Sequence, residues 1–159
     1  MDFYVLEIKE INMETIKYSN LSTEELKCER FGIPFFICEK APRVIRRFED
    51  SGYQRLSVNM ELSKALLEFS SNERPMHVEK LLKGLFVKCD ACLVTDFEML
   101  FDPRYEIDVV KFFCEQARKK NIAIRWPGDF TGTKLTYAEP GDPDYHEYYC
   151  DSYQMRIVV

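Results

Sequence analysis

The sequence predicts a single three-layer α/β domain, a mainly parallel sheet of five strands with helices on both faces. Short apolar runs alternate along the chain with segments whose apolar residues recur at helical spacing. This alternation is typical of βαβ units, in which crossover helices join parallel strands. The 159 residues suffice for one domain with a substantial core, and an apolar share of 46% is too high for a disordered chain.

Five strands are expected from apolar runs that turn residues bound. The run Ile33-Pro34-Phe35-Phe36-Ile37-Cys38 is continuous, which suits a strand buried on both faces. The expected strands lie near residues 33, 54, 91, 122 and 155. Residues 1–9 fit a strand or a helix equally well, so residues 1–30 are treated as an N-terminal extension of the single domain 1–159.

Helices are expected between these strands. Ser22-Thr23-Glu24-Glu25 is a capping box, which begins a short helix before Gly32. Val78, Leu82 and Leu85 belong to one apolar stripe on a longer helix. The expected helices cover about 22–30, 42–50, 60–69, 76–87 and 107–119. A long loop with a short extended piece at 135–138 is expected after the fourth strand.

Composition excludes several classes of protein. The 22 Lys and Arg against 27 Asp and Glu give a net charge of −5, which does not favour DNA binding. No apolar run reaches the roughly 18–20 residues that span a bilayer, and the N-terminus lacks the pattern of a signal peptide. We therefore expect a cytoplasmic protein without membrane contact. Because there are only two histidines, His77 and His146, we expect no metal site.

Six cysteines lie in or beside apolar runs, which is the usual setting of free thiols in a reducing compartment. Cys89 and Cys92 form the one CxxC pair. A structural zinc site needs a second ligand pair, and the sequence offers none. A thioredoxin-type pair opens a helix, whereas this pair leads into a strand. We therefore expect incidental thiols.

The run that contains Leu93 and Val94 ends in Thr95-Asp96-Phe97-Glu98, which looks like the Walker B segment of a P-loop NTPase. There an aspartate supports Mg²⁺ and a nearby glutamate polarises water. A phosphate-binding loop needs glycines in the pattern GxxxxGK[ST], so that backbone amides can surround the phosphates. None of the six glycines fits this pattern.

The expected place of that loop is occupied by Cys38-Glu39-Lys40-Ala41-Pro42-Arg43. It lacks glycine and puts a carboxylate where phosphate would bind. If the chain nevertheless bound a nucleotide, Lys40 and Arg43 would be its phosphate contacts, with Asp96 and Glu98 at Mg²⁺. A basic cluster of Lys40, Arg43, Arg46 and Arg47 could also touch DNA phosphate, or it could be a solvated helix face.

Residues 53–149 resemble BrxF, the small P-loop protein of type 3 BREX phage-exclusion systems. The resemblance lies in five segments, of which the last is the most specific. They are NMELSKALLE at 59–68, RP at 74–75, TDFEMLFDP at 95–103, RWPG at 125–128 and LTYAEPGDPDYHEY at 135–148. The family's Gly-rich Walker A loop has no counterpart here, since residues 38–45 read CEKAPRVI.

The resemblance implies an ASCE-type P-loop fold with strand order 5-1-4-3-2 and a cytoplasmic role in antiviral defence. Its implied partners are the large ATPase, the methyltransferase and the phosphatase-like protein of the same operon. Because the Walker A motif is missing, we expect a degenerate, non-catalytic interaction subunit with no catalytic residue and no cofactor. The alternatives are an ATPase with an atypical phosphate loop, which would use ATP and Mg²⁺, and a DNA-binding accessory module.

An interaction subunit needs exposed side chains outside the core. The candidate loops 98–106 and 126–149 mix aromatic and polar residues, as interface centres and rims do. The candidate contact residues are Phe101, Tyr105, Trp126 and Tyr137. Trp126 and Tyr137 fit equally well as packing residues over the edge of the sheet.

Overall fold

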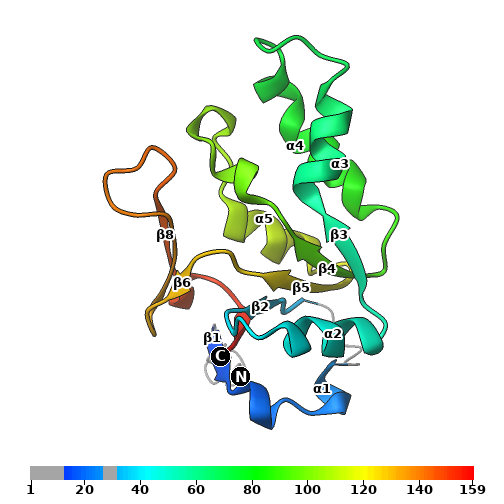
Figure 1. Cartoon of the computed structure of the whole chain (residues 1–159), viewed down its shortest axis with the longest axis vertical. Coiled ribbons are helices and arrows are strands. Elements are labelled where there is room, and N and C mark those ends of the chain that lie inside the picture. The colour runs from blue at the N-terminus through cyan, green and yellow to red at the C-terminus, as the bar shows by residue number, and fades with distance from the viewer. Residues whose placement is uncertain (1–12, 27–31) are drawn as a thin grey trace, which may run out of the picture.

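The structure, a computed structural model, describes residues 13–26 and 32–159 and contains a six-stranded sheet (Figure 1). All five neighbouring strand pairs are parallel, in the order β1-β9-β2-β5-β4-β3. The strands are β1 (Met13–Ile16), β2 (Phe35–Ile37), β3 (Gln54–Ser57), β4 (Ala91–Thr95), β5 (Asn121–Arg125) and β9 (Met155–Val158). The five expected strands are present, but the expected number was wrong because β1 adds an edge strand beside β9.

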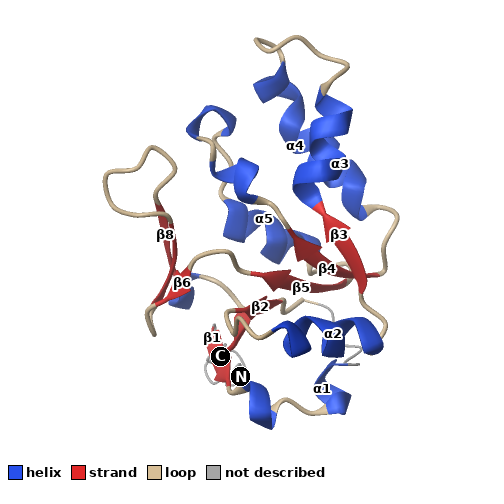
Figure 2. Ribbon diagram, viewed as in Figure 1, coloured by secondary structure: helices blue, strands red, loops and turns tan. Residues whose placement is uncertain are grey.

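Helices cover both faces of this sheet (Figure 2). The α-helices are α1 (Thr23–Leu26), α2 (Pro42–Asp50), α3 (Val58–Leu66), α4 (Arg74–Phe86) and α5 (Val109–Gln116). The 3-10 helices are η2 (Tyr18–Asn20), η3 (Glu98–Phe101), η4 (Pro103–Tyr105) and η5 (Cys150–Ser152). None of the helices in the described ranges has the length and apolar character needed to cross a bilayer.

The two faces of β2 show how the layers form. Side chains alternate along a strand, so Phe35 and Ile37 pack in one apolar cluster with α2, while Phe36 belongs to the other cluster. The first cluster also contains Leu26 of α1, and the second contains the apolar faces of α3, α4 and α5. A continuous apolar run is therefore what a strand between two helical layers requires.

The capping box predicted at the start of the first helix is confirmed. The Ser22 hydroxyl accepts a hydrogen bond from the Glu25 amide, and the Glu25 carboxylate accepts one from the Ser22 amide, both at 3.1 Å. The described part of this helix is Thr23–Leu26. The rest of the expected helix and residues 1–12 lie outside the described residues.

The segment after β5 forms a second, antiparallel sheet. The extended piece expected at 135–138 is confirmed by a strand at Lys134–Tyr137, but the expectation of a loop on either side of it was wrong. The strands of this sheet are β6 (Asp129–Phe130), β7 (Lys134–Tyr137) and β8 (His146–Tyr149). Leu135 of β7 pairs with Tyr148 of β8, and both side chains are buried. Burial of these two side chains against the main core gives this small sheet its stability.

Candidate functional site

The loop after β2 is tied to the loop after β5. The ammonium of Lys40 donates hydrogen bonds to the carbonyl oxygens of Trp126, at 2.9 Å, and Gly128, at 2.8 Å. These loops are neighbours because β2 and β5 pair in parallel and end at the same edge of the sheet. Ligands of parallel α/β sheets bind at this carboxyl edge, so it is the natural place for a site.

The start of α2 has little capacity to bind phosphate. Pro42, at the first helical position, has no amide hydrogen. The amide of Ala41 donates to the carboxylate of Glu39 at 3.1 Å, so an anion of the chain itself already lies at this helix terminus. A phosphate brought here would meet the negative charge of Glu39 instead of free backbone amides.

Residues of the basic cluster predicted around α2 contact different parts of the chain. Arg43 and Arg47 lie over the ring of Tyr18, with guanidinium carbons 5.4 and 5.6 Å from its centre. Arg47 also donates to the carbonyl oxygen of Leu21. The structure therefore uses Arg43 and Arg47 to hold the segment before α1, while Lys40 contacts the loop after β5.

Asp96 ends the buried strand β4 and is exposed. Its φ of 50° is left-handed, a conformation that aspartate tolerates better than most residues. Its carboxylate accepts hydrogen bonds from the hydroxyls of Ser57, at 3.1 Å, and Thr95, at 3.3 Å. Its carbonyl oxygen accepts one from the amide of Asn59 at 2.5 Å. The hydroxyls bonded to this carboxylate therefore come from β3 and β4.

Glu98 is less exposed than Asp96. Its carboxylate accepts a hydrogen bond from the side-chain amide of Asn59 at 2.8 Å. The Asn59 side-chain oxygen accepts one from the amide of Met99 at 3.2 Å. Asn59 therefore links the start of α3 to η3. Because Asn59 is bonded to both Asp96 and Glu98, the two acidic residues belong to one hydrogen-bonded unit. Sequence reasoning missed Asn59, although it stands in the segment NMELSKALLE.

Phe101 and Trp126 are fully buried. The expectation that Phe101 contacts a partner was therefore wrong for the folded chain, whereas Trp126 has the second of its two expected roles, that of a packing residue. The Trp126 indole donates to the carbonyl oxygen of Thr136 at 3.0 Å. Phe101 stacks on Tyr137 with ring centres 4.0 Å apart. Both side chains are covered by β7, since Thr136 and Tyr137 belong to that strand.

Tyr137 and Tyr105 remain partly exposed. Burial, followed by the nearby Glu98 and Asp144 carboxylates, raises the pKa of Tyr137 above its ordinary value. Its phenol is therefore protonated at neutral pH and can donate a hydrogen bond. Within residues 13–26 and 32–159, no three His, Cys, Asp or Glu side chains gather in a way that could hold a metal ion.

The outer face of the β6–β8 sheet carries residues that the sequence analysis did not single out. Paired residues of an antiparallel sheet share a face, so Lys134 with Tyr149 and Thr136 with Glu147 point away from the buried pair Leu135 and Tyr148. Tyr149 is 55% exposed. The sequence HEYY carries little signal for this face, because its buried and its exposed aromatic residue are both tyrosine.

Charged contacts order this outer face. The Lys134 ammonium lies 3.2 Å from the Glu147 carboxylate and 5.6 Å from the centre of the Tyr149 ring. Glu147 also accepts a hydrogen bond from the Tyr145 hydroxyl at 2.8 Å. The Tyr145 hydroxyl and the Lys134 ammonium lower the pKa of Glu147. The result is an exposed aromatic ring with ordered polar neighbours.

No protein-family model matches the sequence, and comparisons with curated proteins and with solved structures find no match. The resemblance to BrxF-like proteins therefore stays a prediction from the sequence.

Proposed function

We propose that this protein is a degenerate P-loop-fold subunit that works by binding other proteins in a prokaryotic antiviral system of the BREX type. The observation that carries the non-catalytic part is the Glu39 carboxylate on the Ala41 amide, in the loop where an active P-loop protein surrounds phosphate. The missing amide hydrogen of Pro42 supports the same conclusion.

The order of the strands supports the fold part of the proposal. Without the edge strand β1, the sheet reads β9-β2-β5-β4-β3. Numbered along the chain, these strands are 5-1-4-3-2, the order that the resemblance implies. Asp96 stands at the end of the third of these strands, where a Walker B aspartate belongs.

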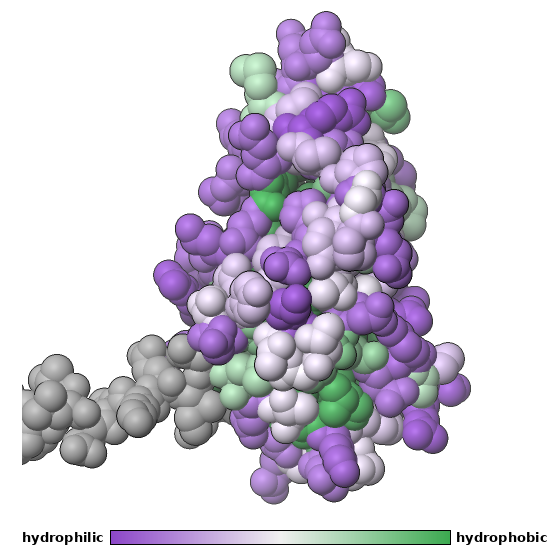
Figure 3. Space-filling model, turned by 90° about the vertical axis from the view of Figure 1, so that its left-hand side faces the viewer, coloured by the Kyte–Doolittle hydropathy of each residue, from purple (hydrophilic) through white to green (hydrophobic). Residues whose placement is uncertain are grey.

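The partner surface is the outer face of the β6–β8 sheet, around Tyr149. Exposed tyrosines with polar neighbours are enriched among the residues that dominate protein interfaces. The side of the molecule that carries this sheet is largely hydrophilic, with hydrophobic residues in separate patches (Figure 3). Such a surface suits a soluble partner in a complex that forms in the cytoplasm, such as the large ATPase, the methyltransferase or the phosphatase-like protein.

Co-purification of the tagged chain with the products of its neighbouring genes tests this proposal. We expect at least one of them to be retained, and we expect Tyr149→Ala to reduce its recovery about tenfold, as loss of a central aromatic contact does. The matched control is Val87→Ala, which changes a side chain that is 78% exposed just beyond the end of α4. A chain that purifies alone under these conditions contradicts the proposal.

Titration calorimetry with ATP and Mg²⁺ separates this proposal from an atypical ATPase. We expect no heat of binding at micromolar concentrations. Binding in this range that disappears in Asp96→Ala would favour the enzyme instead. Duplex DNA binding with a strong salt dependence would favour the accessory DNA-binding module.

A further inference from the structure

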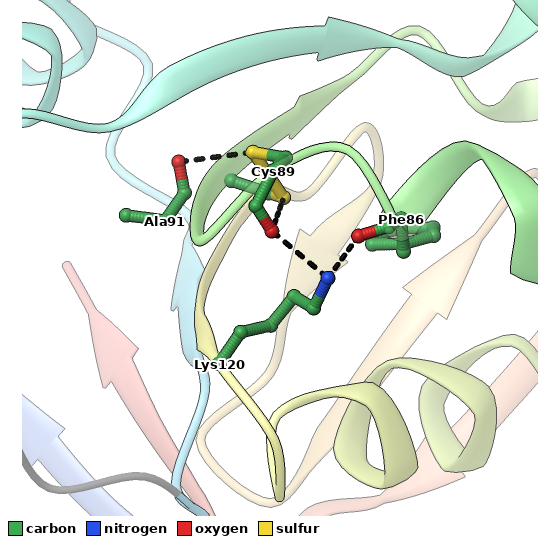
Figure 4. The surroundings of a disulfide bond; sticks show 5 residues. Phe86, Cys89, Ala91 and Lys120 are labelled. Carbon is green, nitrogen blue, oxygen red and sulfur yellow. Dashed lines mark hydrogen bonds between the residues drawn. A yellow bond between two sulfur atoms is a disulfide. The ribbon is translucent and has the colours of Figure 1, made fainter.

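Cys89 and Cys92, expected to be incidental thiols, form a disulfide in the structure (Figure 4). Their Cα atoms are 5.8 Å apart, and the bond closes the short loop between the end of α4 and the start of β4. The expectation of incidental thiols was wrong because this tight loop brings the two side chains together. In a reducing compartment, a disulfide is more often redox-active than structural.

The pair borders a cavity of about 530 Å³ between the edge strand β3 and α4. Cys89 lines this cavity and is 7% exposed, whereas Cys92 is fully buried. Other lining residues are Leu56, Met60, Leu85 and Lys88. Because Cys89 borders the cavity and keeps some exposure while Cys92 has none, we take the sulfur of Cys89 as the one that a reagent attacks and Cys92 as the leaving group.

A half-buried cation lies against the same loop. The Lys120 ammonium donates hydrogen bonds to the carbonyl oxygens of Phe86 and, at 2.8 Å, of Cys89 (Figure 4). It thereby caps the last turn of α4, where the helix dipole is negative. A positive charge beside a cysteine pair favours the thiolate, which is the reactive form of the side chain.

The charges that line the cavity nearly cancel. Lys88 contributes a cation, Glu61 contributes a carboxylate, and the Arg55 guanidinium is paired with the carboxylate of Glu49 at 2.9 Å. An anionic thiol such as glutathione, which carries carboxylates, is therefore not repelled by the walls.

The other cysteines of the described residues are in a different chemical state. Burial raises the pKa of Cys38 and of Cys114 to about 12, and that of Cys150 to about 11. These thiols stay protonated near neutral pH and react slowly. Cys38, Cys114 and Cys150 therefore serve as internal references for the reactivity of Cys89 and Cys92.

We propose that Cys89 and Cys92 are a redox-active pair that exchanges with small thiols and disulfides through the adjoining cavity. In reduction, a thiolate RS⁻ attacks the sulfur of Cys89, the Cys89–Cys92 bond breaks, and Cys92 leaves as a thiolate that takes up a proton. A second RS⁻ attacks the mixed disulfide at the sulfur of RS, releasing RSSR and the Cys89 thiolate, which takes up the second proton. Two thiols are thus oxidised and the pair gains two electrons and two protons. Oxidation by a disulfide such as oxidised glutathione is the reverse.

The full chain, equilibrated in mixtures of reduced and oxidised glutathione, provides the test. After an acid quench and alkylation, peptide mass mapping reports the state of each cysteine. We expect Cys89 and Cys92 to interconvert between dithiol and disulfide, while Cys38, Cys114 and Cys150 stay free thiols. Failure to recover the Cys89–Cys92 disulfide at any ratio would overturn the proposal. Glutathione adducts on Cys38, Cys114 and Cys150 equal to those on Cys89 and Cys92 would overturn it too.

Variants assign the roles within the pair. In Cys92→Ala we expect a stable glutathione adduct at Cys89, and in Cys89→Ala we expect the adduct at Cys92 to form about tenfold more slowly because that sulfur is less accessible. Equal rates would contradict the assignment of Cys89 as the entry sulfur.

Lys120→Met tests the cation, with the exposed neighbour Lys119→Met as the matched control. We expect about threefold slower reaction of the reduced pair with oxidised glutathione in Lys120→Met only, because less thiolate is present. Circular dichroism identifies a variant that does not fold. If a variant fails to fold, the peptide map of the unaltered chain still tests whether Cys89 and Cys92 are redox-active. Equal rates in the two folded variants would remove Lys120 from the mechanism.

Discussion

The ammonium of Lys40 lies 2.8 Å from the carbonyl oxygen of Gly128 and thereby joins the loops that follow β2 and β5. In a P-loop protein a lysine near this position would contact phosphate. Here the Lys40 ammonium is held by backbone oxygens, and the carboxylate of Glu39 accepts the hydrogen bond of the Ala41 amide. Residues that could have contacted a nucleotide thus stabilise the carboxyl edge of the sheet.

Replacement of Lys40 by methionine removes both hydrogen bonds of the ammonium but keeps the length of the side chain. We expect the free energy of unfolding to fall by about 0.5–1.5 kcal/mol, because water can reach this exposed site and replace part of the interaction. Urea melts measure the difference. Lys64→Met, at an exposed position on α3, is the control and should stay within about 0.5 kcal/mol. Equal losses in the two variants would show that the loop contact adds nothing.

Continuous apolar runs made the central strands predictable. β2, β4 and β5 are buried on both faces, so their residues carry the signal directly. The strand β1 was missed because its sequence, METI, exposes two of four residues at the edge of the sheet. Edge strands with polar residues resemble loops in sequence, and only pairing with β9 defines this one.

The site was predictable in its location but not in its exposure. Asp96 follows a buried strand, so its place at the carboxyl edge was a direct consequence of the pattern. The burial of Trp126 depends on the β6–β8 sheet, whose strands are short and separated by turns. Such long-range packing leaves little local signal. This is why Phe101 was expected at the surface and why the sequence could not choose between a surface role and a packing role for Trp126.

Gly128 is required by the close approach of two backbones. A Cβ at this position would overlap the carbonyl oxygen of Thr136, which also accepts the hydrogen bond of the Trp126 indole. Gly128→Ala should therefore displace β7 and lower the free energy of unfolding by about 1–3 kcal/mol. Chemical denaturation followed by the fluorescence of Trp126, the single tryptophan, measures this loss.

Gly84→Ala provides the opposite case. Gly84 lies within α4 and a Cβ there meets nothing within 4 Å. Alanine should raise the free energy of unfolding by about 0.5–1 kcal/mol, because it restricts the unfolded chain and favours the helix. A loss in Gly84→Ala as large as in Gly128→Ala would contradict the steric explanation.

Stability should fall in alkaline solution because of buried thiols. Burial raises the pKa of Cys114 from 9.0 to about 12, so the folded chain keeps a proton that the unfolded chain loses between these values. The free energy of unfolding is therefore independent of this group below pH 9 and decreases as the pH rises from 9 towards 12. Urea melts across this range should show a shallower decrease in Cys114→Ala. An unchanged slope would show that the thiol ionises equally in both states.

The conformation of Asp96 gives a prediction that separates backbone strain from lost hydrogen bonds. Its φ of 50° disfavours residues with a Cβ, and aspartate and asparagine are the side chains that tolerate it best. Asp96→Ala should lower the free energy of unfolding by about 1–2 kcal/mol, because it combines this strain with loss of the bonds from Ser57 and Thr95. Asp96→Asn keeps an oxygen acceptor and the tolerated conformation, so its loss should stay below about 0.5 kcal/mol.

Glu98→Ala is the matched comparison on the same hydrogen-bonded unit. It leaves the side-chain amide of Asn59 without its carboxylate partner at a half-buried site, and we expect a loss of about 0.5–1.5 kcal/mol. Denaturant melts of the three variants, each checked for native circular dichroism, decide the question. If Asp96→Ala and Asp96→Asn lower the free energy of unfolding equally, tolerance of the left-handed backbone does not explain why an aspartate stands at the end of β4. If Glu98→Ala loses none, the link through Asn59 does not hold η3 against α3.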